Sequence, residues 1–179
     1  MTVLFVPECF VGPVNASTGM AEVLREKGGH RCVFAVTGDW QSRLESLGFE
    51  VKLVGPAAVT TGSTDSADSN AKEVEEEGLL DDIDPLEKAI KCQDFIMNHF
   101  ESFEATEPYL KTIIADLRPD LIITDHVLTA PSIVTSGIPW VFSWSSNPLS
   151  LDYGYEDKRL PPSCLGTTGA FKKTLFINF

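Results

Sequence analysis

Short apolar runs alternate with segments of helical periodicity along most of this chain, and this alternation limits the folds open to it. Each run is the length of a buried strand, and the segments between them are long enough to be crossover helices. We therefore predict an α/β fold: a Rossmann-like parallel sheet flanked by helices. The predicted strands are residues 3–6, 32–36, 51–54, 121–124 and 140–144.

The helix-like segments carry start and stop signals. Asn15 or Ser17 is positioned to cap a first helix that Gly28 and the next glycine would end. Asp84 and Pro85 are typical of the start of a long helix, and Pro108 would restart or kink it. The predicted helices cover residues 16–27, 40–47, 85–103, 108–117 and 130–136.

The segment of about residues 57–84 interrupts the alternation of strands and helices. Thr, Ser, Gly, Asp and Glu mix there without periodicity, which predicts a long mobile loop and no secondary structure. Its acidic run, residues 73–84, fits either a solvated loop or a cation site. We favour the solvated loop, because the run lacks the glycine and alternating ligands of a calcium loop. No metal site is predicted.

Composition and charge narrow the possible functions. The chain has 179 residues, 43% hydrophobic and 22% charged, as expected of one folded domain spanning residues 1–179. Its formal net charge of -12 offers no general attraction to nucleic acid. No signal peptide or membrane-spanning run is recognisable. The four widely spaced cysteines predict reduced thiols and a cytoplasmic protein.

Several nucleotide-binding and catalytic motifs are absent from the sequence. Gly12 and Gly19 do not form the Gly-x-Gly-x-x-Gly pattern of dinucleotide sites. No Gly-Lys-Ser or Gly-Lys-Thr of a Walker loop occurs, nor a Gly-x-Ser-x-Gly nucleophile elbow. The lack of a phosphate-cradling loop also argues against a flavodoxin-like domain. We therefore predict no cofactor bound by this chain.

Candidate site residues follow the predicted strands. The carboxyl ends of parallel strands lie along one edge of a sheet, where ligands bind. The turn Phe10-Val11-Gly12-Pro13-Val14-Asn15-Ala16 follows the first strand, and Asp125 ends the fourth. Asp125 fits two interpretations, a site carboxylate or a cap for the next helix. His99 shares a helical stripe with Phe95, a pattern that more often indicates core packing than a pocket.

The turn at Gly12 and the carboxylate Asp125 together resemble the N-terminal, acceptor-binding half of a two-domain GT-B UDP-glycosyltransferase. In that family the turn reads Gly-His-x-Asn-Pro or similar, and an Asp orients its His, which deprotonates the acceptor hydroxyl. Gly12 and Asn15 match, whereas Pro13 stands at the His position. The resemblance implies that acceptor-binding residues are Phe10, Gly12, Pro13, Phe95, His99, Ser143 and Trp144, with Asp125 at the dyad position.

The resemblance implies conjugation of small lipophilic molecules with sugar from a UDP-sugar, which a C-terminal donor-binding domain absent from this chain would hold. Pro13 has no basic side chain, so we expect this chain alone to be inactive. His126 is the closest substitute base in sequence, but adjacent strand residues face opposite ways. The alternative is a non-catalytic protein that binds small molecules on the same fold.

Overall fold

The computed structural model describes residues 1–55, 72, 74–126 and 128–145, with side chains for all of these except 94–102. The chain divides into two compact units, Met1–Ser145 and Ser146–Phe179, and the described residues all belong to the first. The expected loop is thus described only in part. The Arg159–Pro162 segment, which also resembles the glycosyltransferase family, lies outside the described residues.

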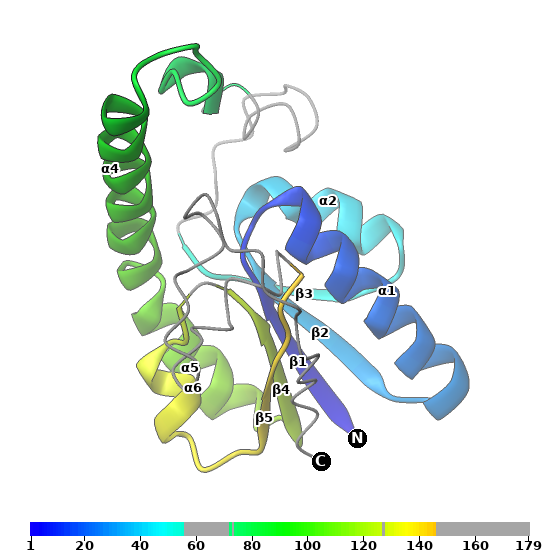
Figure 1. The fold of residues 1–179 in the computed structure, drawn as a ribbon. Helices are drawn as coiled ribbons and strands as arrows, with labels where there is room; N and C mark the ends of the chain where they lie inside the picture. The colour runs from blue at the N-terminus through cyan, green and yellow to red at the C-terminus, as the bar shows by residue number, and fades with distance from the viewer. Residues whose placement is uncertain (56–71, 73, 127, 146–179) are drawn as a thin grey trace, which may run out of the picture. The chain divides into compact units, whose positions relative to one another are not determined.

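A five-stranded, all-parallel sheet forms the centre of the first unit, in the order β3-β2-β1-β4-β5. This confirms the predicted Rossmann-like α/β fold. The chain crosses outward through β2 and β3 on one side of β1, then returns to build β4 and β5 on the other (Figure 1). The strands are β1 (Thr2–Pro7), β2 (Arg31–Val36), β3 (Glu50–Leu53), β4 (Leu121–Asp125) and β5 (Trp140–Phe142).

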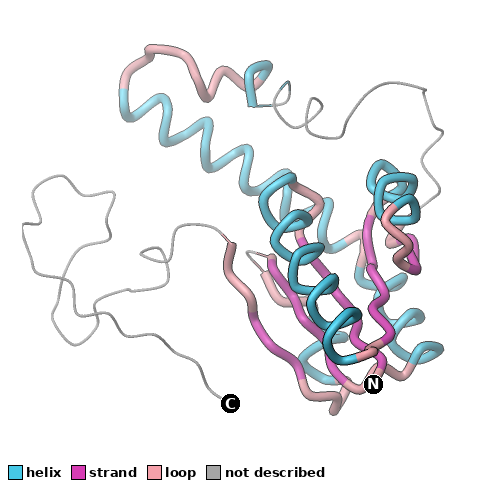
Figure 2. Tube along the Cα trace, turned by 90° about the vertical axis from the view of Figure 1, so that its right-hand side faces the viewer, coloured by secondary structure: helices cyan, strands magenta, loops and turns pink. Residues whose placement is uncertain are grey.

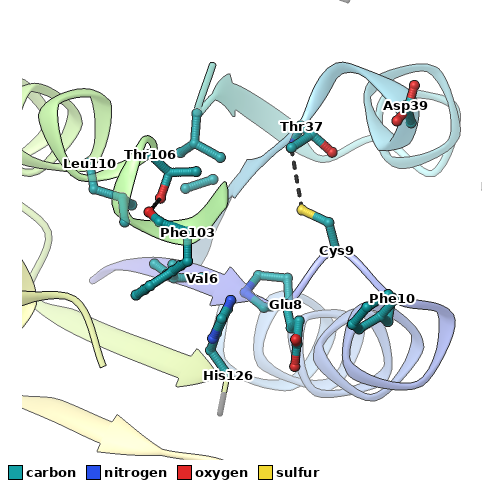
Figure 3. A pocket seen from close by; sticks show the side chains of 13 residues that line it. Val6, Glu8, Cys9, Phe10, Thr37, Asp39, Phe103, Thr106, Leu110 and His126 are labelled. Atoms are coloured by element: carbon teal, nitrogen blue, oxygen red, sulfur yellow. Dashed lines mark hydrogen bonds between the residues drawn. The ribbon is translucent and has the colours of Figure 1, made fainter. Parts of the chain in front are cut away.

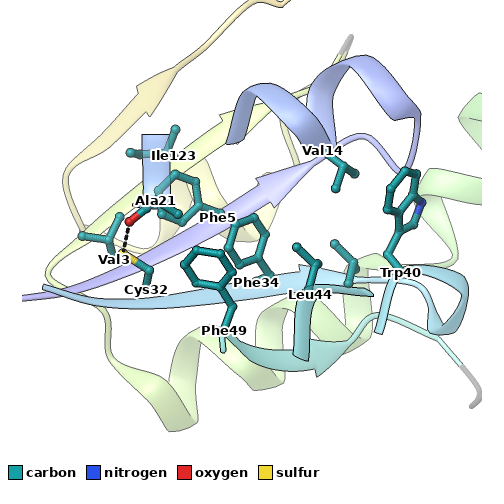
Figure 4. Close-up of a cluster of buried hydrophobic side chains, with 11 residues drawn as sticks. Val3, Phe5, Val14, Ala21, Cys32, Phe34, Trp40, Leu44, Phe49 and Ile123 are labelled. Carbon is teal, nitrogen blue, oxygen red and sulfur yellow. Dashed lines mark hydrogen bonds between the residues drawn. The ribbon is translucent and has the colours of Figure 1, made fainter. Parts of the chain in front are cut away.

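The strands β1, β2 and β4 are buried on both faces, which explains why they are continuous apolar runs. Side chains alternate along β1, so Val3 and Phe5 join one core cluster while Leu4 and Val6 join the other. Figure 4 shows the first cluster, in which Phe34 packs between aromatic neighbours and α1 and α2 close the face. The second cluster packs against α5 and α6.

The helices flank the strands, as Figure 2 shows. Gly29 has a positive φ of 59° at the C-cap of α1, a left-handed conformation that glycine adopts most easily, so the predicted helix end is confirmed. Pro108 restarts the helix as predicted, at the beginning of α5. The helices are α1 (Val11–Gly28), α2 (Gly38–Ser46), α4 (Pro85–Glu104), α5 (Glu107–Leu117) and α6 (Pro131–Thr135).

The predicted start of the first helix is wrong. Helix α1 begins at Val11 with Phe10 as its N-cap and no side-chain cap, five residues before the expected start. Pro13 lies inside the first turn, where a helix has no acceptor for the missing N–H and the fixed φ is already helical. Asn15 accepts a hydrogen bond from the Arg43 guanidinium (3.0 Å) and does not cap the helix.

The structure tests two further predictions, the cap of the long helix α4 and the lack of secondary structure before it. Asp84 caps α4 as predicted, because its Oδ1 accepts from the N–H of Leu86 at 2.9 Å. The prediction of no secondary structure over residues 57–84 is wrong for the described part, since residues 72 and 74–76 are helical. Among the described residues, no helix is both long enough and apolar enough to cross a membrane.

Candidate functional site

A cavity of about 200 Å³ opens at the carboxyl edge of the sheet. Its lining comes from the ends of β1, β2, β3 and β4 and from the junction of α4 with α5. The strand order reverses between β1 and β4, so part of the cavity lies at the switch point where open α/β sheets bind ligands. The lining residues are Val6, Pro7, Glu8, Cys9, Phe10, Ala35, Thr37, Asp39, Val54, Phe103, Thr106, Leu110 and His126 (Figure 3).

One wall is formed by the segment that links β1 to α1. The Cys9 Sγ accepts a hydrogen bond from the N–H of Thr37 at 3.4 Å, as Figure 3 shows. The Cys9 carbonyl accepts another from the indole N–H of Trp40 at 2.9 Å. These bonds tie the segment to α2. Burial raises the pKa of the Cys9 thiol, and Glu8 and Asp39 raise it to a lesser extent, so the thiol stays protonated near neutral pH.

The opposite wall is aromatic. The His126 ring lies 4.0 Å, centroid to centroid, from the ring of Phe103. His126 Nδ1 accepts a hydrogen bond from the N–H of Leu128 at 3.2 Å. A neutral imidazole whose Nδ1 accepts carries its proton on Nε2, so that nitrogen is a hydrogen-bond donor. The lone pair of Nδ1 is therefore not available to take a proton from a ligand.

Asp125 lies beside the cavity and does not line it. Its side chain is 2% exposed, and Oδ1 accepts from the N–H of Ser145 at 3.2 Å, whereas Oδ2 is buried without a hydrogen-bond partner. Its carbonyl accepts from the N–H of Glu8 at 2.7 Å, which joins the ends of β4 and β1. The helix-cap interpretation is wrong, because the N–H of Ser132 at the start of α6 donates to Glu107 and the N–H of Leu128 donates to His126, and neither donates to Asp125.

The remaining predicted site residues fall into three groups. Phe10 lines the cavity, whereas Gly12 and Pro13 lie in the first turn of α1 outside its lining. Ser143 donates its N–H to the Thr124 carbonyl at 2.7 Å, and Trp144 stacks on Phe142 with centroids 5.7 Å apart. Neither lines the cavity. Phe95 and His99 belong to α4, but their side chains lie outside the described residues.

Several lining residues were not identified from the sequence as site residues. Glu8, Thr37 and Asp39 follow strand ends directly, so strand order would have placed them at this edge. Thr106 and Leu110 come from the helix pair α4 and α5, and no local sequence signal connects that pair to the end of β1. Contacts between the α4 and α5 pair and the end of β1 arise only from the way the helices pack on the sheet.

Neither a search for metal-binding groups nor comparison with known proteins assigns a function to this site. In the described part of the chain, no three His, Cys, Asp or Glu side chains form a group that could hold a metal ion. None of the models of known protein families matches the sequence. A search of curated proteins likewise gives no match.

Proposed function

We propose that this chain is the acceptor-binding half of a UDP-glycosyltransferase that conjugates small lipophilic molecules. In this proposal the carboxyl-edge cavity holds the acceptor, and a separate donor-binding half holds the UDP-sugar. Support comes from a cavity with both apolar and polar lining at the switch point of a parallel sheet, next to the turn and the carboxylate that carry the family resemblance.

The observation that carries the proposal is the unsatisfied Oδ2 of Asp125. A buried carboxylate oxygen is ordinarily hydrogen-bonded, and leaving one unpaired costs about 1–3 kcal/mol or more. In the resembling family a histidine N–H bonds the carboxylate at this position. Here Pro13 occupies the histidine position and offers no N–H at all. An orphaned oxygen beside a strand end is what the loss of that histidine would leave behind.

Pro13 also determines the expected chemistry. A general base typically contributes about 10²–10⁴-fold to the rate of proton removal from an acceptor hydroxyl. Without it, transfer to ordinary alcohols is slow, while acceptors that are already acidic, such as phenols and carboxylic acids, lose less. His126 does not replace the base in this proposal, because its Nδ1 already accepts from Leu128.

The second candidate function is a binding protein without catalysis, and the same proline favours it. Such a protein would hold a small apolar molecule in the cavity and never turn it over. The two candidates agree on the ligand class and on the cavity. They differ in one respect: in the enzyme, the rest of the catalytic site is intact and only the histidine is missing, whereas the binding protein has no catalytic site.

The test joins this chain to the donor-binding half of a UDP-glycosyltransferase and compares the native sequence with Pro13→His. We expect both to bind a phenolic acceptor, and Pro13→His to raise turnover of an alcohol acceptor by about 10²-fold or more. Pro13→Ala is the matched control, since it removes the proline without adding a base, and it should leave turnover low. Unchanged turnover in Pro13→His with binding retained would favour the binding protein. Absence of acceptor binding in every variant would contradict both candidates.

A further inference from the structure

The apolar lining of the cavity is a continuation of the second core cluster. The residues that line the cavity and also belong to this cluster or pack against it are Val6, Ala35, Val54, Leu110 and Phe103. Figure 3 shows Val6, Phe103 and Leu110 gathered on one side of the cavity. The apolar end of the cavity is therefore a space that this core leaves unfilled where it reaches the carboxyl edge of the sheet.

Side-chain size along the strands explains why the core leaves that space. Side chains at alternate positions of a strand share a face, so this face of the sheet carries successive rows across β2, β1 and β4. The inner row, which is in register and 0% exposed, is Val33, Leu4 and Ile122. The next row toward the carboxyl edge is Ala35, Val6 and Thr124. Each member of this second row is smaller than the residue before it on the same face of its strand.

Ala35 has the smallest side chain in the second row. It is 1% exposed, so it meets the cavity at the closed end, away from solvent. The other buried residues of β2 are a cysteine, two valines and a phenylalanine, all of them larger. Protein interiors are close-packed, and they rarely leave room beside a short side chain. The β-carbon of Ala35 thus accounts for a space that a larger residue would fill.

The size of the cavity matches a molecule with one ring. Its volume is about 200 Å³, and an apolar cavity of ~150 Å³ is enough to hold benzene. One six-membered ring with a short substituent therefore fits, whereas a second fused ring would have to displace packed side chains. Thr37 and Asp39 also line the cavity, so a hydroxyl group on the substituent has polar neighbours.

We propose that Ala35 is a specificity-determining residue, and that the space beside it selects single-ring alcohols and phenols over molecules with two fused rings. This inference rests on the proposed function, because it names the class of acceptor for the same cavity. Val6 lies beside Ala35 on the neighbouring strand β1 and limits the same space from that side.

The test is a calorimetric titration of the purified chain with 2-phenylethanol and with 2-(2-naphthyl)ethanol, which differ by one fused ring. We expect the native chain to bind the phenyl alcohol at least about tenfold more tightly, because the larger ring system overpacks the site. Ala35→Val should weaken binding of the phenyl alcohol by about tenfold or more. Its melting temperature should stay the same or rise, because valine fills a free space and favours a strand.

Val33→Ile is the matched control, since it enlarges a side chain on the same strand and the same face, one row deeper. That row is already filled, so this variant should have a lower melting temperature and unchanged affinity for both alcohols. A larger drop in melting temperature for Ala35→Val than for Val33→Ile would show that no space exists beside Ala35, and it would overturn the inference.

Val6→Ala tests the same space in the opposite direction. It should narrow the difference between the two alcohols by about threefold or more, because it makes room for the second ring. Combining Val6→Ala with Ala35→Val conserves the volume of the row and should restore most of the native preference. Equal binding of the phenyl alcohol by the native chain and Ala35→Val would overturn the inference while leaving the cavity as a lipophilic site. If neither alcohol binds the native chain, the proposed function fails as well.

Discussion

At the scale of single residues, three buried side-chain atoms in the described part of the chain lack hydrogen-bond partners: Ser17 Oγ, His30 Nδ1 and Asp125 Oδ2. The first and the last lie in contrasting places. Ser17 Oγ lies on the side of α1 that faces the core, fully buried among apolar groups. Asp125 Oδ2 lies at the carboxyl end of β4, next to a cavity. An unpaired hydroxyl inside a core only costs stability, whereas under the proposed function the unpaired carboxylate oxygen is what remains of a site.

Removing the Ser17 hydroxyl should therefore not destabilise the protein. We expect Ser17→Ala to leave the free energy of unfolding unchanged or raise it by up to about 1 kcal/mol, because it removes an unpaired polar group and favours the helix. Thr124→Val is the matched comparison, since the Thr124 hydroxyl donates to the Val6 carbonyl at 3.2 Å. It should cost about 1 kcal/mol in urea denaturation. Equal destabilisation by the two variants would contradict this account of Ser17.

The protonated thiol of Cys9 leads to a prediction of slow reactivity. Burial raises the pKa of this thiol, and only the thiolate reacts with iodoacetamide. At pH 7.5 we expect Cys9 to be alkylated several-fold more slowly than N-acetylcysteine, with the rate still rising above pH 9. Peptide mass mapping measures the rate at this one cysteine. Labelling at the rate of the free thiol would show that the segment between β1 and α1 does not bury it.

At the scale of elements, the buried strands could be predicted more closely than the start of α1. Continuous apolar runs mark buried parallel strands regardless of their neighbours, so β1, β2 and β4 lie within about a residue of prediction. The start of α1 was missed, because proline is tolerated in a first turn and Phe10 leaves no capping signature. β5 ends at Phe142 and is therefore shorter than its predicted run, which extended to residue 144.

The ion pair between Arg31 and Glu50 links β2 to β3, and it should make the free energy of unfolding depend on pH. Hydrogen bonds from Arg31, at 2.6 and 3.0 Å, hold the pKa of Glu50 below its ordinary value. Glu50 therefore binds a proton more readily in the unfolded chain than in the folded one. The stabilisation by this ion pair is complete above the unfolded pKa of about 4.3, and it is lost as the pH falls through the lower pKa of the folded state.

We expect Glu50→Gln to lower the free energy of unfolding by less than about 1 kcal/mol at pH 7, because the side chain is 35% exposed. The difference from the native protein should shrink at pH 3. Urea denaturation at both values measures it, with Glu26→Gln as a control for net charge. A deficit that grows on acidification would contradict the sign of this linkage.

The carboxylate of Glu107 joins α5 to α6. It accepts from the Ser132 N–H at 2.8 Å and from the Ser132 hydroxyl at 3.0 Å, and so satisfies the start of α6 from a neighbouring helix. We expect Glu107→Ala to cost about 1–2 kcal/mol, as the loss of a helix cap does. Glu104→Ala, an exposed position at the end of α4, should cost less than about 0.5 kcal/mol. Comparable melting temperatures for the two variants would contradict the cap.

At the scale of the whole first unit, the sequence predicted the edge of the sheet that bears the cavity but only part of its lining. Strand alternation predicts a parallel sheet, and a parallel sheet places its ligand edge at the strand ends. Phe10 and His126 follow from that rule. The contributions of Phe103 and Leu110 depend on how the α4 and α5 junction packs over the sheet, which no short motif encodes.

The central claim is that this carboxyl-edge cavity binds a small lipophilic molecule, and an NMR titration with 2-phenylethanol tests it most directly. Saturable shifts of the amide signals of Cys9, Thr37, Thr106 and His126 are the predicted result, with the Glu26 amide at the far end of α1 unaffected. Phe103→Ala should weaken binding by removing one wall of the cavity. Shifts confined to the exposed strand β5, or no saturable shift at any concentration, would contradict the account.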